Sequence, residues 1–347
     1  AEAQVIDAAG KWVLPGFIDA HTHLGVCEET YRIEGDDTNE MTDPVTPHVR
    51  ALDAINPEDE GFKDAVAGGI TSVFAAPGSG NVIGGMGLVM KTTGKIVDKM
   101  VLRDPAGMKV AFGENPKRVY GEEKKMPMTR MGTAALLRET LVKAQTYLEA
   151  LEKGKQDPDE MPERDLKMEA LGKVLNKEIP LRAHAHRADD IMTAVRIARE
   201  FNIELVIEHC TEGHKIAEEL AEIGVPAVVG PSLSNRAKIE LKDITFKTPG
   251  ILAKAGVKVA LMTDHPVTPI QYLPICAGLA TREGMSREEA FRAITINAAE
   301  ILGVADRLGS LSPGKDADVV IWSENPLEVM AKPVMVIIDG KVVFQTA

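Results

Sequence analysis

Two histidines separated by one residue, His21 and His23, are the first candidates for chemistry in this chain. They follow the apolar run 12–18, which is typical of a buried strand. Alternate residues of a strand point to the same face, so both imidazoles could bind one divalent ion. Two histidines that merely pack in a strand would have the same spacing. Metal binding is therefore favoured only if further donors converge on this pair.

Further nitrogen and oxygen donors stand at the ends of other apolar runs. They are His184, His186, His209, Asp264 and Glu114. In a closed barrel the carboxyl ends of the strands meet at one rim, where barrel enzymes place their chemistry. Five or six such donors on one rim suit Zn²⁺, Fe²⁺ or Mn²⁺. The sequence therefore predicts a metal site at the rim of a barrel.

The elements that must position these donors alternate along the chain. Strand-like stretches end near residues 23, 76, 91, 113, 186, 209, 230 and 263, and several segments between them have helical periodicity. This alternation predicts an α/β fold, a (β/α)8 TIM barrel over residues 14–309.

The two ends of the chain have a different pattern. Residues 319–322 and 334–344 are short apolar runs without helices between them, and Asp339-Gly340 is a hairpin signal. Residues 3–8 could supply a further strand. We therefore expect a second, small β-domain, an incomplete β-sandwich built from residues 1–13 and 310–347.

Composition narrows the range of partners and compartments. The net charge of −12 argues against nucleic acid, and no run is long and apolar enough to span a bilayer or to act as a signal peptide. Three cysteines do not make a disulfide framework, so we expect the reducing cytoplasm. The seven carboxylates between residues 28 and 43 could attract a cationic substrate, or they could form a solvated surface loop.

The motifs as a set resemble the amidohydrolase superfamily of metal-dependent hydrolases over nearly the whole chain. The matching stretches are residues 15–25 (PGFIDAHTHLG), 69–73 (GITSV), 207–210 (IEHC), 263–266 (TDHP) and 295–322. Within the superfamily, the chain is similar to the branch of imidazolonepropionases and metal-dependent dipeptidases. The resemblance implies a small β-sandwich with strands from before the barrel, so about fifty further residues would be expected ahead of this chain.

The resemblance also assigns roles to residues. It implies that His21, His23, His184 and His209 bind metal and that Asp264 both binds metal and takes a proton from the attacking water. Members with two metals also need a bridging carboxylate. Glu114 is our candidate because it follows the apparent fourth strand, and Lys91 or Lys109, if carboxylated, are the alternatives.

The predicted activity is hydrolysis of a carbon–nitrogen bond in a cyclic or linear amide by metal-activated water. Asp264 is the expected general base, and His209 or His186 would stabilise the oxyanion. Zinc is the first choice of cofactor, with iron or manganese as alternatives and one or two ions per chain. The expected partner is a small-molecule substrate, and a homo-oligomer is left open. A dipeptidase, a deaminase, a metal-requiring isomerase and a non-catalytic relative remain alternatives.

Overall fold

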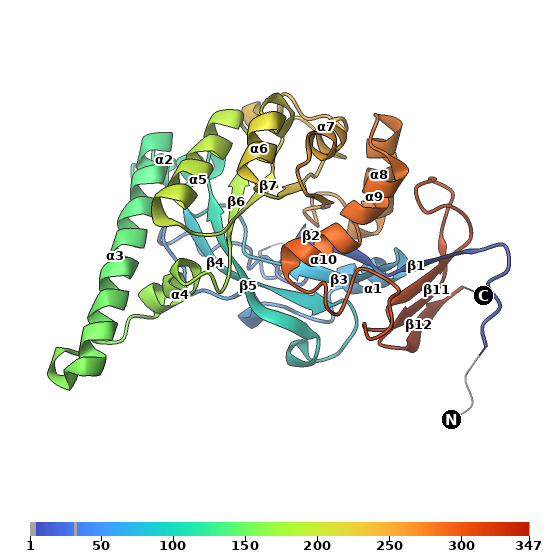
Figure 1. Cartoon of the computed structure of the whole chain (residues 1–347), viewed down its shortest axis with the longest axis horizontal. Coiled ribbons are helices and arrows are strands. Elements are labelled where there is room, and N and C mark those ends of the chain that lie inside the picture. Colours follow the sequence, from blue (N-terminus) through green and yellow to red (C-terminus); the bar gives the residue numbers. More distant parts are fainter. Residues whose placement is uncertain (1–4, 31–32, 347) are drawn as a thin grey trace.

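The computed structural model describes residues 5–30 and 33–346. Its centre is a sheet of eight strands whose order in space follows their order in the chain (Figure 1). The strands are β2 (Phe17–Thr22), β3 (Ile70–Ala75), β4 (Ile83–Lys91), β5 (Val101–Ala111), β6 (Leu181–Ala185), β7 (Leu205–His209), β8 (Ala227–Val229) and β9 (Val259–Leu261). Most of these strands are buried along their whole length, which explains why they are continuous apolar runs in the sequence.

The first and last strands of this sheet meet at a seam. The backbone N–H of Asp264 donates to the carbonyl of His21 at 3.2 Å, and the hydroxyl of Thr263 donates to Asp19 Oδ2 at 2.6 Å. Burial raises the pKa of Asp19 to about 7, although hydrogen bonds from Thr263 oppose the increase. These contacts close the sheet into most of a barrel, with Asp19 at the join.

The direction of β4 differs from the prediction. A (β/α)8 barrel has eight parallel strands, but β4 pairs with both β3 and β5 in antiparallel orientation. The connections on either side of β4, residues 76–82 and 92–100, contain no α-helix. Parallel neighbours need a crossover of about a dozen residues or more, so these short connections can join only antiparallel strands. The end of β4 at Lys91 therefore lies at the opposite rim from the ends of the other strands.

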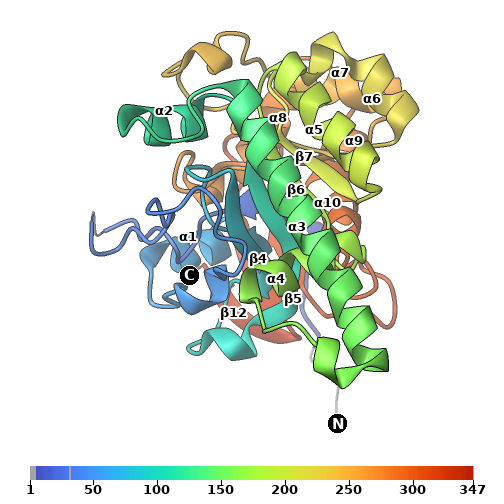
Figure 2. The same cartoon turned by 90° about the vertical axis from the view of Figure 1, so that its left-hand side faces the viewer.

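Helices cover the outside of the barrel. They are α1 (Glu60–Ala67), α2 (Glu114–Glu122), α3 (Arg130–Gln156), α4 (Leu166–Leu175), α5 (Ala188–Phe201), α6 (Ala217–Ile223), α7 (Thr248–Ala255), α8 (Leu273–Arg282), α9 (Arg287–Ala293) and α10 (Ile296–Leu302). The longest, α3, crosses the outer surface beside α4 and α5 (Figure 2). Its buried side chains Leu137, Leu141 and Ala144 recur at helical spacing and form its core-facing stripe.

The chain ends form a second sheet in the order β1–β10–β11–β12, from β1 (Trp12–Pro15), β10 (Val319–Trp322), β11 (Pro333–Ile338) and β12 (Lys341–Gln345). The predicted hairpin at Asp339-Gly340 is confirmed, with both residues at positive φ. The strand expected over residues 3–8 is not found: residues 5–8 form none, and residues 3 and 4 lie outside the described residues. The division into residues 1–13 with 310–347 and residues 14–309 stays a prediction, although β1 extends to Pro15.

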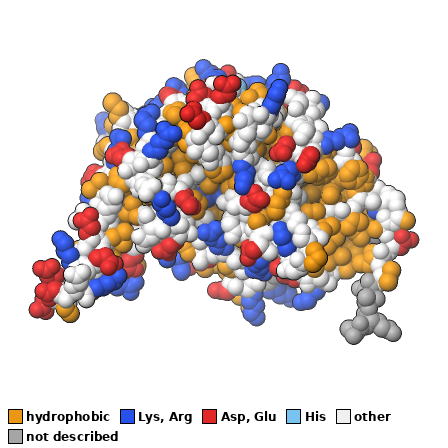
Figure 3. Space-filling model, in the orientation of Figure 1, with side chains coloured by type: hydrophobic (Ala, Val, Ile, Leu, Met, Phe, Trp, Pro, Cys, Tyr) orange, Lys and Arg blue, Asp and Glu red, His pale blue; other side chains and the backbone are white. Residues whose placement is uncertain are grey.

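The small sheet carries exposed apolar side chains. Trp12, Val13 and Val342 are each more than two-fifths exposed. Figure 3 shows hydrophobic side chains gathered over this end of the molecule. Between the small sheet and the barrel, Lys91 forms ion pairs with Asp316, Asp318 and Asp339 at 3.0, 2.6 and 3.3 Å. Lys91 thus joins the two sheets, and the alternative that it bridges metals at the rim is wrong.

Candidate metal centre

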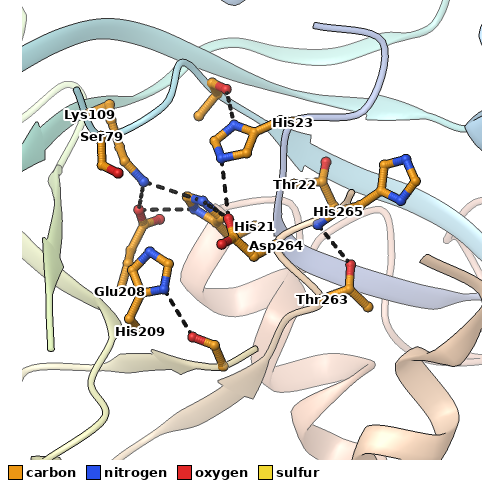
Figure 4. A network of polar contacts seen from close by, with 12 residues as sticks. His21, Thr22, His23, Ser79, Lys109, Glu208, His209, Thr263, Asp264 and His265 are labelled. Carbon is orange, nitrogen blue, oxygen red and sulfur yellow. Dashed lines mark hydrogen bonds and ion pairs between the residues drawn. The ribbon is translucent and has the colours of Figure 1, made fainter. Parts of the chain in front are cut away.

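One group of donors lies at the seam of the barrel. Asp264 Oδ1 is 3.2 Å from the Nε2 atoms of both His21 and His23 (Figure 4). His21 and His23 come from the end of β2, and Asp264 follows β9 with a φ of 53°. A non-glycine residue in this left-handed region costs about 1–2 kcal/mol, so the surrounding structure must hold Asp264 there.

A second group lies beside the first, at the ends of β6 and β7. His184, His186 and His209 each offer a ring nitrogen within 4.8 Å of the other two. His209 also belongs to a group with His21 and Asp264 by the same measure. The rim therefore holds two adjoining sets of donors that meet at His209.

Hydrogen bonds at the far side of the rings orient these imidazoles. The Nδ1 atom of His23 lies 2.8 Å from the carbonyl of Ala76, and that of His209 lies 3.0 Å from the carbonyl of Gly230. A carbonyl can only accept, so Nδ1 of both rings carries a proton and donates, and the Nε2 atoms are turned towards the other donors. Metal-binding histidines are commonly fixed in this way.

Burial keeps several of these rings neutral. Desolvation, followed by the charge of His186, lowers the pKa of His184 well below its ordinary value, and desolvation lowers that of His186 to about 4. Desolvation, followed by the charge of His184, likewise lowers the pKa of His209. Burial alone would raise the pKa of Asp264, but hydrogen bonds with His21 and His23 outweigh it and lower the pKa. Neutral imidazoles and an ionised carboxylate are the forms that bind metal.

Sequence reasoning missed Glu208, which lies at the centre of the charged network below the rim. Its carboxylate is fully buried and lies 3.0 Å from His21 Nδ1, 2.8 Å from Lys109 Nζ and 2.7 Å from Arg182 Nε. Burial alone would raise the pKa of Glu208, but these three groups outweigh it and hold the pKa well below its ordinary value. Arg182 also donates to the carbonyl of Ala20, next to His21. Glu208 and Arg182 thus position the first histidine.

The structure brings Lys109, and not Glu114, to the donors. Lys109 Nζ lies 3.3 Å from His21 Nε2, on the strand predicted to carry a bridge. Glu114 lies beyond the end of β5, as the first residue of α2. Among the described residues its side chain makes no hydrogen bond or ion pair with any histidine of the rim. The bridging role predicted for Glu114 therefore lacks a contact that would support it.

Sequence reasoning also missed a second charged pair, Lys238 and Glu240. They belong to the segment between β8 and α7, and Glu240 is 1% exposed. Glu240 Oε1 lies 3.7 Å from His186 Nε2, 3.9 Å from His184 Nε2 and 3.7 Å from Lys238 Nζ. This segment has no periodic pattern in the sequence, so nothing in the sequence indicated that it folds over the rim.

The donors open into a pocket of about 390 Å³, the size of a small-molecule site. Four histidines, Lys109 and Asp264 form its floor, and the wall combines apolar residues with polar side chains and Lys238. The polar wall residues are Thr38, Asn39, Ser79, Asn115, Ser234, Asn235 and Lys238. The acidic stretch 28–43 contributes only the uncharged Thr38 and Asn39 to this lining. The pocket therefore gives no support to the idea that this stretch attracts a cationic substrate.

A barrel with histidines and a carboxylate at the carboxyl ends of its strands has the architecture of the barrel hydrolases. Comparison with known proteins narrows this class. A sequence profile described as the amidohydrolase family matches residues 132–344. A solved structure of an amidohydrolase from Thermotoga maritima MSB8 is 51% identical, with a TM-score of 0.97, over 99% of this chain and 90% of that one. The chain therefore belongs to the amidohydrolase family, a class of enzymes that hydrolyse carbon–nitrogen bonds.

Curated relatives have related names. Amidohydrolase tasK of Hapsidospora irregularis is 32% identical over 99% of this chain, which spans only 37% of that protein's length. An imidazolonepropionase from Cupriavidus pinatubonensis is 27% identical over 93% of this chain and 78% of its own length.

Among the described residues, no helix is long and apolar enough to cross a membrane.

Proposed function

We propose that this protein is a metal-dependent hydrolase of the carbon–nitrogen bond of a cyclic or linear amide. The observation that carries the proposal is the position of Asp264 on the floor of the pocket, with its Oδ1 atom 3.2 Å from the Nε2 atoms of His21 and His23. The imidazolonepropionase name of a relative supports the cyclic form of the substrate. A dipeptidase and a deaminase on the same scaffold remain the alternatives.

The donors fit a divalent cation. His184 is buried, and neither of its ring nitrogens has a hydrogen-bond partner in the part of the chain that is described. His23 and His209 are held through Nδ1, so their Nε2 atoms are available to a cation in the same pocket. We assign the ligands as His21, His23, His184, His209 and Asp264, with zinc as the first choice and iron or manganese as alternatives. When bound, a divalent ion lowers the pKa of water from 15.7 towards about 7 and polarises a carbonyl group.

The chain's own residues move the proton. Asp264 is ionised and faces the pocket, so it accepts the proton of the attacking water and then donates it to the leaving nitrogen. His186, which lines the pocket and is not among the assigned ligands, stabilises the developing oxyanion. Glu208, Arg182 and Lys109 hold His21 in place from below.

The wall of the pocket favours an anionic substrate. Lys238 is the cation of the wall away from the floor, and its Nζ donates to the side chain of Asn115 at 2.8 Å. Asn115 in turn donates to Ser79. A substrate carboxylate could bind Lys238 while its amide lies over the floor. N-acyl amino acids, dipeptides and lactam carboxylates are the substrates that combine both groups.

A substrate panel tests the proposal. Purified protein, loaded with zinc, iron or manganese, is incubated with dipeptides, N-acyl amino acids, lactam carboxylates and aminopurines, and the products are identified by mass spectrometry. Hydrolysis of a carboxylate-bearing amide that is lost in Asp264→Asn is expected. Release of ammonia from aminopurines would make the protein a deaminase, and a panel without turnover under any metal would overturn the hydrolase assignment.

A further inference from the structure

The carboxylate of Glu240 is held with one oxygen bound and the other free. Glu240 Oε2 accepts the backbone N–H of Glu114 at 3.0 Å, at the amino end of α2. Gly113 caps this helix with a φ of 82°, and a Cβ at Gly113 would lie 2.7 Å from Glu240 Oε2. Glycine at this position thus leaves room for the carboxylate, and the helix amino end favours its charge.

The other oxygen faces two histidines. Glu240 Oε1 is buried and has no hydrogen-bond partner among residues 5–30 and 33–346. It lies 3.9 Å from His184 Nε2 and 3.7 Å from His186 Nε2, and His184 Nε2 also lacks a partner there. Burying an acceptor and a ring nitrogen without partners is costly unless a further group satisfies both.

The distance from Glu240 Oε1 to each histidine nitrogen is close to the distance between two ligands of one ion. Two donors each about 2.1 Å from one ion lie about 3.4 Å apart at a tetrahedral angle. The observed separations are a few tenths of an ångström wider, and small side-chain rotations would close that difference. The nitrogen and carboxylate donors match the preferences of zinc.

We propose that Glu240 is a metal ligand and that, with His184 and His186, it completes a second metal site next to the one at the seam. His186, assigned to catalysis from the sequence, becomes a ligand in this arrangement. The inference rests on the proposed metal centre and extends it to a residue from the β8–α7 segment.

One competing explanation is an ion pair. Lys238 Nζ lies 3.7 Å from Glu240 Oε1, so Glu240 could serve only to hold Lys238. Lys238 donates to Asn115 at 2.8 Å, which is a closer contact, and its side chain is 31% exposed. Lys238→Met separates the two explanations because it removes the cation and leaves every donor of the second site.

The test measures metal content and metal affinity. Metal-free wild type, Glu240→Gln and Lys238→Met are titrated with Zn²⁺ and with Co²⁺, and bound metal is read by elemental mass spectrometry and by visible absorption. Glu212→Gln is the matched control, since Glu212 is also buried near the rim but accepts from the N–H of Ala188. Circular dichroism checks that each variant is folded.

We expect wild type to bind two ions and Glu240→Gln to lose one, or to bind it at least about tenfold more weakly. Lys238→Met and Glu212→Gln should keep both. Equal metal content and affinity in wild type and Glu240→Gln would overturn the inference but leave the proposed function intact. Wild type that binds no metal would overturn both.

A crystal structure of wild type soaked in Zn²⁺ covers the case in which Glu240→Gln does not fold. An ion about 2.0–2.2 Å from Glu240 Oε1 is expected. Ions bound at the rim with Glu240 Oε1 outside coordination distance would overturn the inference.

Discussion

Arg182→Met removes the cation that supports the candidate centre from below. Arg182 is completely buried, with Nε 2.7 Å from Glu208 Oε1 and its guanidinium stacked 4.1 Å from the ring of Phe74. Methionine keeps the apolar stem and removes the charge, so the change tests the ion pair more than the packing. The carbonyl of Ala20, next to His21, also loses its donor.

The expected loss of stability follows from the partners that remain. Removing one member of a buried ion pair costs about 3–5 kcal/mol because the other charge is left without compensation. Glu208 keeps Lys109 at 2.8 Å, so we expect the lower end of this range, about 3 kcal/mol, for Arg182→Met. Glu208→Gln leaves both Lys109 and Arg182 without their carboxylate, so it should lie at the upper end, about 5 kcal/mol.

Urea unfolding of the metal-free proteins, followed by circular dichroism, measures these values. The double variant Arg182→Met/Glu208→Gln should cost less than the sum of the single variants by about 0.5–3 kcal/mol, since it leaves only Lys109, and no longer Arg182, without a carboxylate. Arg138→Met is the control because the Arg138–Glu200 pair is exposed and should contribute less than about 1 kcal/mol. An Arg182→Met protein within about 1 kcal/mol of wild type, or strict additivity in the double variant, would refute this reasoning.

Three further predictions concern the donors and the joint between the sheets. Asp264→Asn should lower kcat per bound metal at least about a hundredfold, because the proton acceptor is lost, and near-normal turnover would show that another group takes the proton. If Lys109 is carboxylated in the metal-loaded protein and bridges two ions, Lys109→Gln should reduce the bound metal by one ion while Glu114→Gln leaves it unchanged; the opposite result, by elemental analysis, would return the bridge to Glu114. Lys91→Met should lower stability at pH 7 by about 3 kcal/mol in urea titrations, because it leaves Asp316, Asp318 and Asp339 without a cation. Burial alone would lower the pKa of Lys91, but Asp318 and its neighbours raise it. The loss of unfolding free energy in Lys91→Met should therefore become smaller as pH rises past 10.5 towards the pKa of Lys91 in the folded protein. Burial alone would raise the pKa of Asp316, but Arg307 and Lys91 lower it. The difference in unfolding free energy between Lys91→Met and wild type should therefore also shrink as pH falls below 3.8. A difference that does not depend on pH would contradict the ion pairs of Lys91.

The sequence was sufficient to predict the strand-end donors. His21, His184, His209 and Asp264 each end an apolar run, and a barrel brings such ends to one rim. The number of strands and the hairpin at Asp339-Gly340 followed from equally local signals. The assignments of these side chains as ligands stay predictions until metal is measured.

Three charged residues inside strands indicated a buried ionic network, although only Lys109 among them was considered from the sequence, as an alternative bridge. Lys109, Arg182 and Glu208 stand within apolar runs, where a charge must find a partner. Which partner depends on register: Lys109 pairs with Arg182 across β5 and β6, and Arg182 pairs with Val206, two residues before Glu208. Register between strands that are far apart in the chain is a tertiary property, so local patterns could not supply it.

The direction of β4 and the position of Glu240 were missed for different reasons. The direction of β4 was predictable, since the connections around it are too short for parallel crossovers. The position of Glu240 was not, because its segment has no helical or strand period and its fold depends on the rim that it covers. Lys91 was misplaced only because β4 was taken to run with the other strands.

The seam between β2 and β9 has a consequence for folding. Every other neighbouring pair in the barrel sheet joins strands that are consecutive in the chain. The contact between Asp19 and Thr263 instead closes a loop of 244 residues. Contacts between residues far apart in the chain form slowly. The entropy cost of closing the loop grows only with the logarithm of its length, so the contact is thermodynamically favourable once the other strands are in place.

His21 and Asp264 stand on opposite sides of this seam, so the same step that completes the barrel also assembles the donors. An ion that binds both residues stabilises the closed barrel, because it cannot bind both when the seam is open. At a free concentration one hundred times its Kd, such an ion would stabilise the closed state by about 2.7 kcal/mol. Metal should therefore act on refolding chiefly by slowing the dissociation of β9 from β2.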